Sequence, residues 1–320
     1  MKKTGIWLII AAFLVLIGGM IFTVAMMGVN WDFSSLRGSY ETRTVQIEEA
    51  FRDISVMTNT ADISVLPSED GTCKAVFQDS KKEWHSVSVE EGTLFVKANI
   101  SNDPKDVISY LVGSRTPKIS LYLPEKEYNM LFIEEHTGDI AISEDFSFEK
   151  IDIQVTTGDV SCNASSRGPV SIVTSTGDIS VERTSAKEYS LAVSTGKIRM
   201  DSVAAEEDVS IAVSTGRIEL NGISAGNFLS GGGTGKIFLE NVICREKISI
   251  ERSTGDVTLK DCDAAELEIK TGTGDVEGTL LSEKVFVVKT NTGKIEVPET
   301  VTGGKCKITT TTGDIRITFK

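Results

Sequence analysis

The sequence predicts an all-β fold, a single-stranded parallel β-helix (β-solenoid) with about 19–20 residues per coil, preceded by one transmembrane helix. Three observations predict it: a four-residue turn that recurs ten times, apolar residues at every second position around that turn, and a long uncharged run at the N-terminus. They divide the 320 residues into an anchor at 1–30, a short tether at 31–44 and a repeat domain at 45–320.

The N-terminal segment predicts where the protein resides. Lys2 and Lys3 precede an uncharged run whose core, residues 6–29, is 24 residues long. About 20 apolar residues cross a bilayer, whereas the apolar region of a cleaved signal peptide covers about 7–15. The sequence therefore favours an uncleaved single-pass anchor in the cell membrane over a cleaved signal. The N-terminus should lie in the cytoplasm, because positive residues stay inside, and the repeat domain should be extracytoplasmic.

The repeated turn has the sequence Thr-Gly-(Asp/Lys/Arg)-(Ile/Val). Its glycines, 19 or 20 residues apart, are Gly138, Gly158, Gly177, Gly196, Gly216, Gly235, Gly255, Gly274, Gly293 and Gly313. A sharp corner between strands often needs a positive φ, which glycine adopts without steric cost. A phosphate-binding loop would have to precede a helix, and no helical pattern follows any copy. The glycine therefore predicts the corner of a coil.

Apolar and polar residues alternate on both sides of the turn. In the repeat at Gly216, the apolar residues at positions −7, −5, −3, +2, +4 and +7 are Val209, Ile211, Val213, Ile218, Leu220 and Ile223. A spacing of two predicts a strand with one buried face. Each coil therefore has two short strands, and position +7 marks a third, shorter side. One coil buries too few apolar side chains to fold alone, so coils must stack.

The pattern extends towards the N-terminus, with Ala61 and Pro117 in the place of the glycine. The interval between them is close to three periods, which predicts about thirteen or fourteen coils in all. The repeat should be less regular over 45–125, with an insertion near 99–115, and regular over 126–320. The chain ends in an apparent strand at 315–320, which predicts an open edge that contacts a partner or another copy.

The residue after each turn glycine should point outward, and it is always charged. The ten residues are Asp139, Asp159, Asp178, Lys197, Arg217, Lys236, Asp256, Asp275, Lys294 and Asp314. Stacked carboxylates at 139, 159 and 178 are candidates for calcium. A pair such as Asp256 and Asp275 resembles the carboxylate spacing of retaining glycosidases. The alternative is a polar turn residue balanced by its basic neighbours. We predict this structural role, with no catalytic, cofactor-binding or metal-binding residue.

Composition argues against several classes of site. The net charge of −13 and the pI of about 4.8 do not favour nucleic acid as a partner. The two histidines, His85 and His136, argue against a histidine-based metal site or triad. The five cysteines are Cys73, Cys162, Cys244, Cys262 and Cys306. Their odd number and the lack of a CxxC pair predict small buried apolar residues. We expect no cofactor and no enzymatic activity.

An anchor followed by repeated Ser-Thr-Gly-Asp-Ile-x-Val, as at Ser175–Val181, resembles a bacterial family of unknown function whose members are called adhesins or LiaG-like. The resemblance covers residues 45–320. It implies a β-helical extracytoplasmic domain, and it carries over no catalytic residues. We expect a non-catalytic adhesin or surface-binding scaffold, with envelope proteins or surface polysaccharide as partners. An accessory role in envelope-stress signalling is the alternative, and a polysaccharide-acting β-helix enzyme is the third candidate. The oligomeric state stays open.

Overall fold

The computed structural model describes residues 3–28, 40–79, 83–100 and 116–320. The N-terminal segment forms helix α1 (Lys3–Gly28). Among the described residues, however, no helix combines the length and apolarity that a bilayer span requires, so the predicted transmembrane helix is not supported. Most of the predicted tether at 31–44 and of the predicted insertion at 99–115 lies outside the described residues, and a strand already begins at Glu41.

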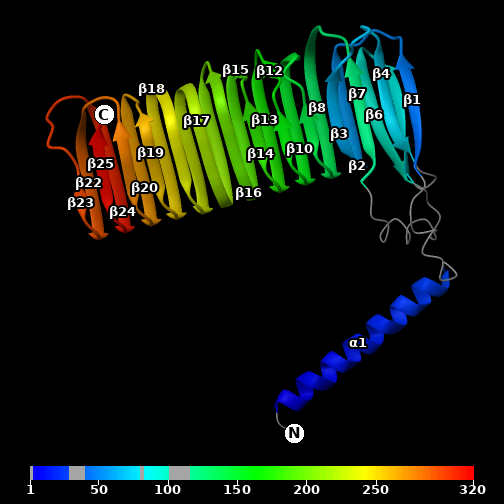
Figure 1. The fold of residues 1–320 in the computed structure, drawn as a ribbon, viewed down its shortest axis with the longest axis horizontal. Helices are drawn as coiled ribbons and strands as arrows, with labels where there is room; N and C mark the ends of the chain where they lie inside the picture. Colours follow the sequence, from blue (N-terminus) through cyan, green and yellow to red (C-terminus); the bar gives the residue numbers. More distant parts are fainter. Residues whose placement is uncertain (1–2, 29–39, 80–82, 101–115) are drawn as a thin grey trace.

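The repeat domain is a stack of coils, each with one strand before the corner and one after it (Figure 1). The strands before the corner are β2 (Asp53–Thr60), β8 (Glu127–Thr137), β10 (Ser147–Thr157), β13 (Pro169–Thr176), β20 (Glu266–Thr273), β22 (Lys284–Thr292) and β24 (Gly304–Thr312). The strands after it are β3 (Asp62–Pro67), β7 (Lys118–Leu123), β9 (Ile140–Ile142), β11 (Val160–Cys162), β14 (Ile179–Glu182), β19 (Val257–Cys262), β21 (Val276–Leu280), β23 (Ile295–Glu296) and β25 (Ile315–Phe319).

The middle coils have longer strands. β16 (Glu188–Ala205), β17 (Asp208–Thr234) and β18 (Ile237–Thr254) continue around bends of the coil without a break. The predicted third side exists as two short strands, β12 (Ser165–Ser166) and β15 (Ser185–Ala186), and as the later parts of β16 and β17. Successive coils pair in parallel, with equivalent positions directly opposite one another. The predicted parallel solenoid is thereby confirmed.

The core lies inside the coils, where the sequence pattern placed it. The six apolar residues predicted for the coil at Gly216 are all buried. Val209 pairs with Tyr189 of the preceding coil, and Ile218 pairs with Ile198. The five cysteines are also buried, with free thiols, as small apolar residues of this core. Each apolar position thus becomes a continuous row along the stack, which a single coil could not supply.

Glycine is required at the corner for two reasons. Gly158 has a φ of 150°, a conformation that L side chains rarely adopt. A Cβ atom on Gly158 would also overlap the carbonyl oxygen of Gly138 in the neighbouring coil. The N–H of Gly158 donates to the carbonyl of Thr176 in the coil on its other side at 2.9 Å. Each of the ten corner glycines has a positive φ and a neighbouring carbonyl in the same place.

The N-terminal end differs from the predicted coils. Between Ala61 and Pro117 the chain forms β4 (Cys73–Asp79), which pairs antiparallel with β1 (Glu41–Ile47) and β7. It then forms an antiparallel hairpin of β5 (Glu83–Glu90) and β6 (Thr93–Ile100). The prediction of thirteen or fourteen coils is therefore wrong, and about ten coils carry the glycine corner. The interval fitted three periods, but antiparallel strands show the same alternation as coil strands.

Stacking order departs from chain order at both ends (Figure 1). β2 lies between β6 and β8, and β3 lies between β7 and β9. At the opposite end, β24 lies between β20 and β22, and β25 lies between β21 and β23. The C-terminal strand is therefore internal, and the prediction that it forms the open edge is wrong. β22 and β23 are the last strands of the stack, because the segment 297–303 leads the chain back inside them.

We predict that Gly158→Ala lowers the free energy of unfolding by at least about 2 kcal/mol, because the new methyl group meets a backbone oxygen in a strained φ region. Urea denaturation followed by circular dichroism measures the change. Gly231→Ala is the matched control, since a Cβ there meets no atom within 4 Å, and it should change stability by less than about 0.5 kcal/mol. Equal losses in the two variants would contradict the close approach at the corner.

Candidate functional site

The aspartates after the corner glycines form a ladder of hydrogen bonds along the stack. Oδ1 of Asp139 accepts the backbone N–H of Asp159 at 2.9 Å, and Oδ1 of Asp159 accepts that of Asp178 at 2.7 Å. The same bond joins Asp62 to Asp139, Asp178 to Lys197, Asp256 to Asp275, Asp275 to Asp314 and Asp314 to Lys294. The aspartate thus accepts a hydrogen bond from a backbone N–H of the next corner for which no backbone carbonyl is the acceptor.

This ladder bears on whether the aspartates after the corner glycines bind calcium or have a structural role. The structure brings Asp139, Asp159 and Asp178 together in consecutive coils, as the sequence predicts, but their Oδ1 atoms are already occupied by backbone donors. Among the described residues, no group of three or more His, Cys, Asp or Glu side chains is arranged to hold a metal ion. The geometry favours the structural role of the column.

The two carboxylates of the Asp256–Asp275 pair are engaged by neighbouring groups of the corner. Oδ2 of Asp256 lies 3.0 Å from Nζ of Lys236, and its Oδ1 accepts the N–H of Asp275 at 3.2 Å. The Lys236 hydrogen bond, followed by that from Asp275, holds the pKa of Asp256 below its usual value. Oδ1 of Asp275 in turn accepts the N–H of Asp314 at 2.8 Å, so one oxygen of each carboxylate in the pair is engaged by the backbone.

A groove borders the ladder on the outer face of the strands after the corner. Its first part is a hollow of about 290 Å³ whose floor carries small side chains at position +3. The residues around this hollow are Asp139, Ile140, Ala141, Asp159, Val160, Ser161, Asp178, Ile179, Ser180, Lys197 and Arg199. Because Ala141, Ser161 and Ser180 stand where later coils carry long side chains, the surface is lowered here over three coils.

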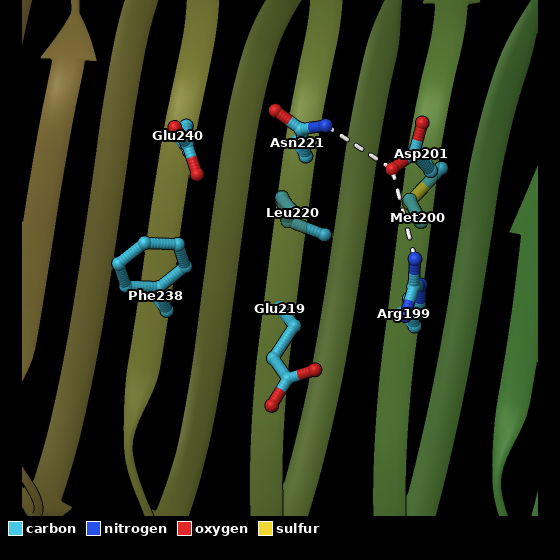
Figure 2. A pocket seen from close by; sticks show the side chains of 8 residues that line it. All are labelled: Arg199, Met200, Asp201, Glu219, Leu220, Asn221, Phe238 and Glu240. Carbon is cyan, nitrogen blue, oxygen red and sulfur yellow. Dashed lines mark hydrogen bonds and ion pairs between the residues drawn. The ribbon is translucent and has the colours of Figure 1, made fainter.

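Arg199 also borders the second part of the groove, a hollow of about 380 Å³ shown in Figure 2. Its lining is Arg199, Met200, Asp201, Glu219, Leu220, Asn221, Phe238 and Glu240. Oδ2 of Asp201 accepts a hydrogen bond from Nδ2 of Asn221 at 3.1 Å and lies 3.8 Å from Nη2 of Arg199. The hydrogen bonds from Asn221 and from Ser202 hold the pKa of Asp201 below its usual value, so this carboxylate is charged at neutral pH.

Phe238 gives the second hollow an aromatic side chain among these charged groups. Its ring is half-buried on the outer face of β18, beside Glu219 of the preceding coil (Figure 2). Three neighbouring coils thus present an aromatic ring, a guanidinium, an amide and carboxylates side by side. The sequence analysis missed these residues because it followed the column at +1. The signal was the outward position +3, where small residues give way to Arg199, Glu219 and Phe238.

A second polar cluster lies buried at the N-terminal end. Oδ2 of Asp79 lies 2.7 Å from Nε of Arg43, and its Oδ1 lies 2.9 Å from Nδ1 of His85. Glu83 and Glu135 are buried nearby. Burial, reinforced by the charges of Glu135 and Asp79, raises the pKa of Glu83 to about 7. Burial likewise raises the pKa of Glu135 to about 7 and lowers that of His85. The sequence did not indicate this cluster, since Arg43 lies in the predicted tether, Glu135 in the regular repeat and the other members between them.

Hydrogen bonds from neighbouring groups allow Glu135 to be buried in the core. It occupies the inward position −3, where Oγ1 of Thr58 in the neighbouring coil donates to its Oε2. The N–H of Thr137 donates to its Oε1 at 3.1 Å. These bonds favour the carboxylate, but burial outweighs them in setting the pKa. The group is therefore a satisfied hydrogen-bond acceptor whose charge is costly, and its stability contribution depends on pH.

Comparison with known proteins agrees with this fold. The sequence profile of the Toastrack DUF4097 family matches residues 51–221 and 206–320. Among solved structures, a proposed adhesin from Parabacteroides merdae has a TM-score of 0.53 and 13% identity, and the match covers 75% of this chain and 96% of that one. This likeness shows a common fold. A comparison with curated proteins gives no match.

Two proteins from Parabacteroides distasonis are also similar. One is a proposed adhesin with 10% identity and a TM-score of 0.42, covering 87% of this chain and 97% of its own. The other is a proposed lipid-binding protein with 16% identity and a TM-score of 0.43, covering 88% and 98%. Scores below 0.5 give these two no weight in the argument. The expected adhesin-type family is confirmed, while its LiaG-like part stays a prediction.

We predict that Asp159→Ala lowers the free energy of unfolding by about 1 kcal/mol, because the N–H of Asp178 loses its acceptor. Asp159→Asn keeps an oxygen in the same place and should cost less. Urea denaturation measures both changes, and calcium should leave the melting temperature of the unaltered protein unchanged. A rise in melting temperature with calcium that Asp159→Asn abolishes would instead establish a cation site.

We predict that Glu135→Gln becomes more stable than the unaltered protein as pH rises. The pKa of Glu135 is raised from 4.5 to about 7 in the folded state, so the folded state binds the proton more tightly than the unfolded state. Its stabilising effect is complete below pH 4.5 and is lost as pH rises through about 7. The stability difference between the two proteins should therefore grow from pH 4.5 to 7 and then level off.

Urea denaturation at a series of pH values checks this prediction. Because the charge of Glu135 helps to raise the pKa of Glu83, Glu135→Gln also reduces that shift, which changes stability in the same direction. The control is Glu134→Gln, the exposed neighbour of Glu135, which should show no such pH-dependent gain. A difference that stays constant from pH 4 to 8 would show that Glu135 is not buried as described.

Proposed function

Because the chain belongs to the Toastrack DUF4097 family and carries a groove along the stack of its coils, we propose that it is a non-catalytic surface protein that binds a linear polysaccharide. The observation that carries the proposal is the second hollow, where Phe238 lies beside Glu219, Asp201 and Asn221. The name of the structural neighbour from Parabacteroides merdae, a proposed adhesin, agrees with a role at the surface.

The chemistry of the hollow fits a sugar. The apolar face of a pyranose ring packs on an aromatic side chain, and its hydroxyl groups exchange hydrogen bonds with carboxylates, amides and guanidinium groups. Asp201, Asn221 and Arg199 already form a linked set of such groups, so their side chains are held in place before a ligand binds. Pre-organised polar groups around an apolar platform are the usual composition of a ligand site.

The direction of the groove fits a polymer. Its two hollows share Arg199, and each coil adds about 4.8 Å along the stack. An extended polysaccharide has a repeat close to this spacing, so successive sugar units can meet equivalent positions of successive coils. The net charge of −13 repels strongly anionic chains. A neutral or weakly charged polysaccharide is therefore the proposed ligand.

Attachment to the membrane is part of the proposal, and its support comes from the sequence. The uncharged run that follows Lys2 and Lys3 has the length and orientation signal of an anchor. On this proposal the repeat domain lies outside the cell. Deletion of residues 1–30 should move the protein from the membrane fraction of the expressing cells to the soluble fraction. Retention of the shortened chain on membranes would contradict this mode of attachment.

The two other candidate functions have weaker support. An accessory role in envelope-stress signalling rests on the family resemblance of the sequence alone. A polysaccharide-acting enzyme needs two carboxyl groups that are free to act on the substrate, whereas Oδ1 of Asp256 and Oδ1 of Asp275 each accept a backbone N–H of the corner. Binding without cleavage is therefore the function that the geometry supports best.

We predict that Phe238→Ala weakens binding of a neutral polysaccharide about tenfold, because an aromatic contact contributes about 1 kcal/mol beyond its buried area. The test is a glycan array that selects the polysaccharide, followed by calorimetry with the full-length protein in detergent. Thr258→Ala is the matched control, since Thr258 holds the same outward position +3 one coil further on, outside the hollow. Equal affinities of the two variants would contradict a site at Phe238.

A further inference from the structure

Arg252 is a basic side chain in a core position that most coils fill with small or apolar groups. Arg252 lies at the inward position −3 of the coil at Gly255, and only 2% of its surface is exposed. The equivalent residues in other coils include Thr174, Val193, Val213 and Thr271. An arginine at this position must direct its guanidinium group into the interior of the solenoid.

Gly232 makes the space for this guanidinium. It is the register partner of Arg252 in the adjacent coil, and a Cβ atom on it would collide with Nη1 of Arg252. The guanidinium therefore occupies the place of the missing side chain. Nη1 reaches past Gly232 and donates to the carbonyl oxygen of Val213, two coils away, at 2.7 Å.

Three polar atoms in this part of the core lack protein partners among the described residues. Nε and Nη2 of Arg252 have no hydrogen-bond acceptor among the described residues, and neither does Oγ of Ser230 have a partner there. Ser230 is 5% exposed and precedes Gly232 by two residues on the same strand, so both face the interior. The register pairs Ser230 with Ile250 and Gly232 with Arg252. Ser230 and Arg252 therefore lie on adjacent strands, two register positions apart, and both are buried.

The positive charge of Arg252 is also uncompensated by the chain. Burial alone lowers its pKa, and no carboxylate among the described residues opposes that shift. Arginine nevertheless stays protonated at neutral pH. A buried charge is stable only when it is paired and hydrogen-bonded. The charge and the three free donors, Nε, Nη2 and Oγ, therefore require the same complement, a negatively charged hydrogen-bond acceptor.

We propose that Arg252 and Ser230 bind a small monovalent inorganic anion, of the charge and size of chloride, inside the solenoid. One negative charge balances the one guanidinium, and a spherical ion can accept hydrogen bonds from donors on two adjacent coils. A divalent oxyanion would leave excess charge in surroundings that include Ile250 and Val213. This site is separate from the groove on the outer face and does not depend on the proposed polysaccharide binding.

The decisive experiment is a crystal of the full-length protein grown in bromide. Data collected at the bromine absorption edge should give an anomalous peak within contact distance of Nε or Nη2 of Arg252 and Oγ of Ser230. A water molecule at that place gives no anomalous signal. The absence of a peak there overturns the proposal, whatever the variants below show.

Thermal unfolding of the full-length protein in detergent gives a second test in solution. At constant ionic strength, replacing gluconate by chloride should raise the melting temperature, and Arg252→Met should abolish that rise. Arg217→Met, which removes an exposed guanidinium from a nearby coil, is the matched control and should retain it. An equal chloride response in the two variants overturns the proposal. If Arg252→Met does not fold, Ser230→Ala takes its place and should reduce the rise.

Discussion

The structure depends on the close approach of successive backbones at the corner of each coil. There the carbonyl of one glycine lies where a Cβ of the next would stand, and the N–H of a corner glycine such as Gly158 or Gly274 donates to a threonine carbonyl of the adjacent coil. This contact fixes the register of the whole stack, because a shift of one residue would place Cβ atoms against carbonyls. The parallel ladders on either side, and the rows of core residues inside, follow from that register.

The corner is held together in two ways, which differ in the residue that follows the glycine. Where an aspartate follows, its Oδ1 accepts the N–H of the next coil, as between Asp159 and Asp178. Where Lys197 and Arg217 follow, strand pairing continues directly through the corner. The basic residues are thus free to reach outward, and Arg217 pairs with Glu219 on the same face. The outer face can therefore vary in sequence without any change in the backbone.

The fold could be predicted from the sequence in the part of the chain where the 19–20-residue interval and the alternation of apolar residues agree. Val209 and Ile218 could be placed in the core because alternation and the 19–20-residue interval agree there. The insertion of β25 between β21 and β23 could not be predicted, since Gly293 and Gly313 keep the regular interval whichever coil lies outside. The groove could not be predicted for a related reason. Phe238 forms a hollow only together with residues of other coils, which lie about one period away in the chain.

The inward row at position −3 shows how this solenoid admits polar groups to its core. In several coils a threonine lies there, as at Thr310, whose Oγ1 donates to the carbonyl of Gly274 at 3.1 Å. Glu135 and Arg252 place charged groups at this position instead. Thr58 donates a hydrogen bond to Glu135, and Gly232 leaves space for the guanidinium of Arg252. Because the row lies beside the corner, carbonyls and N–H groups are always within reach of it. The corner thus sets both the fold and the places where buried charges can be held.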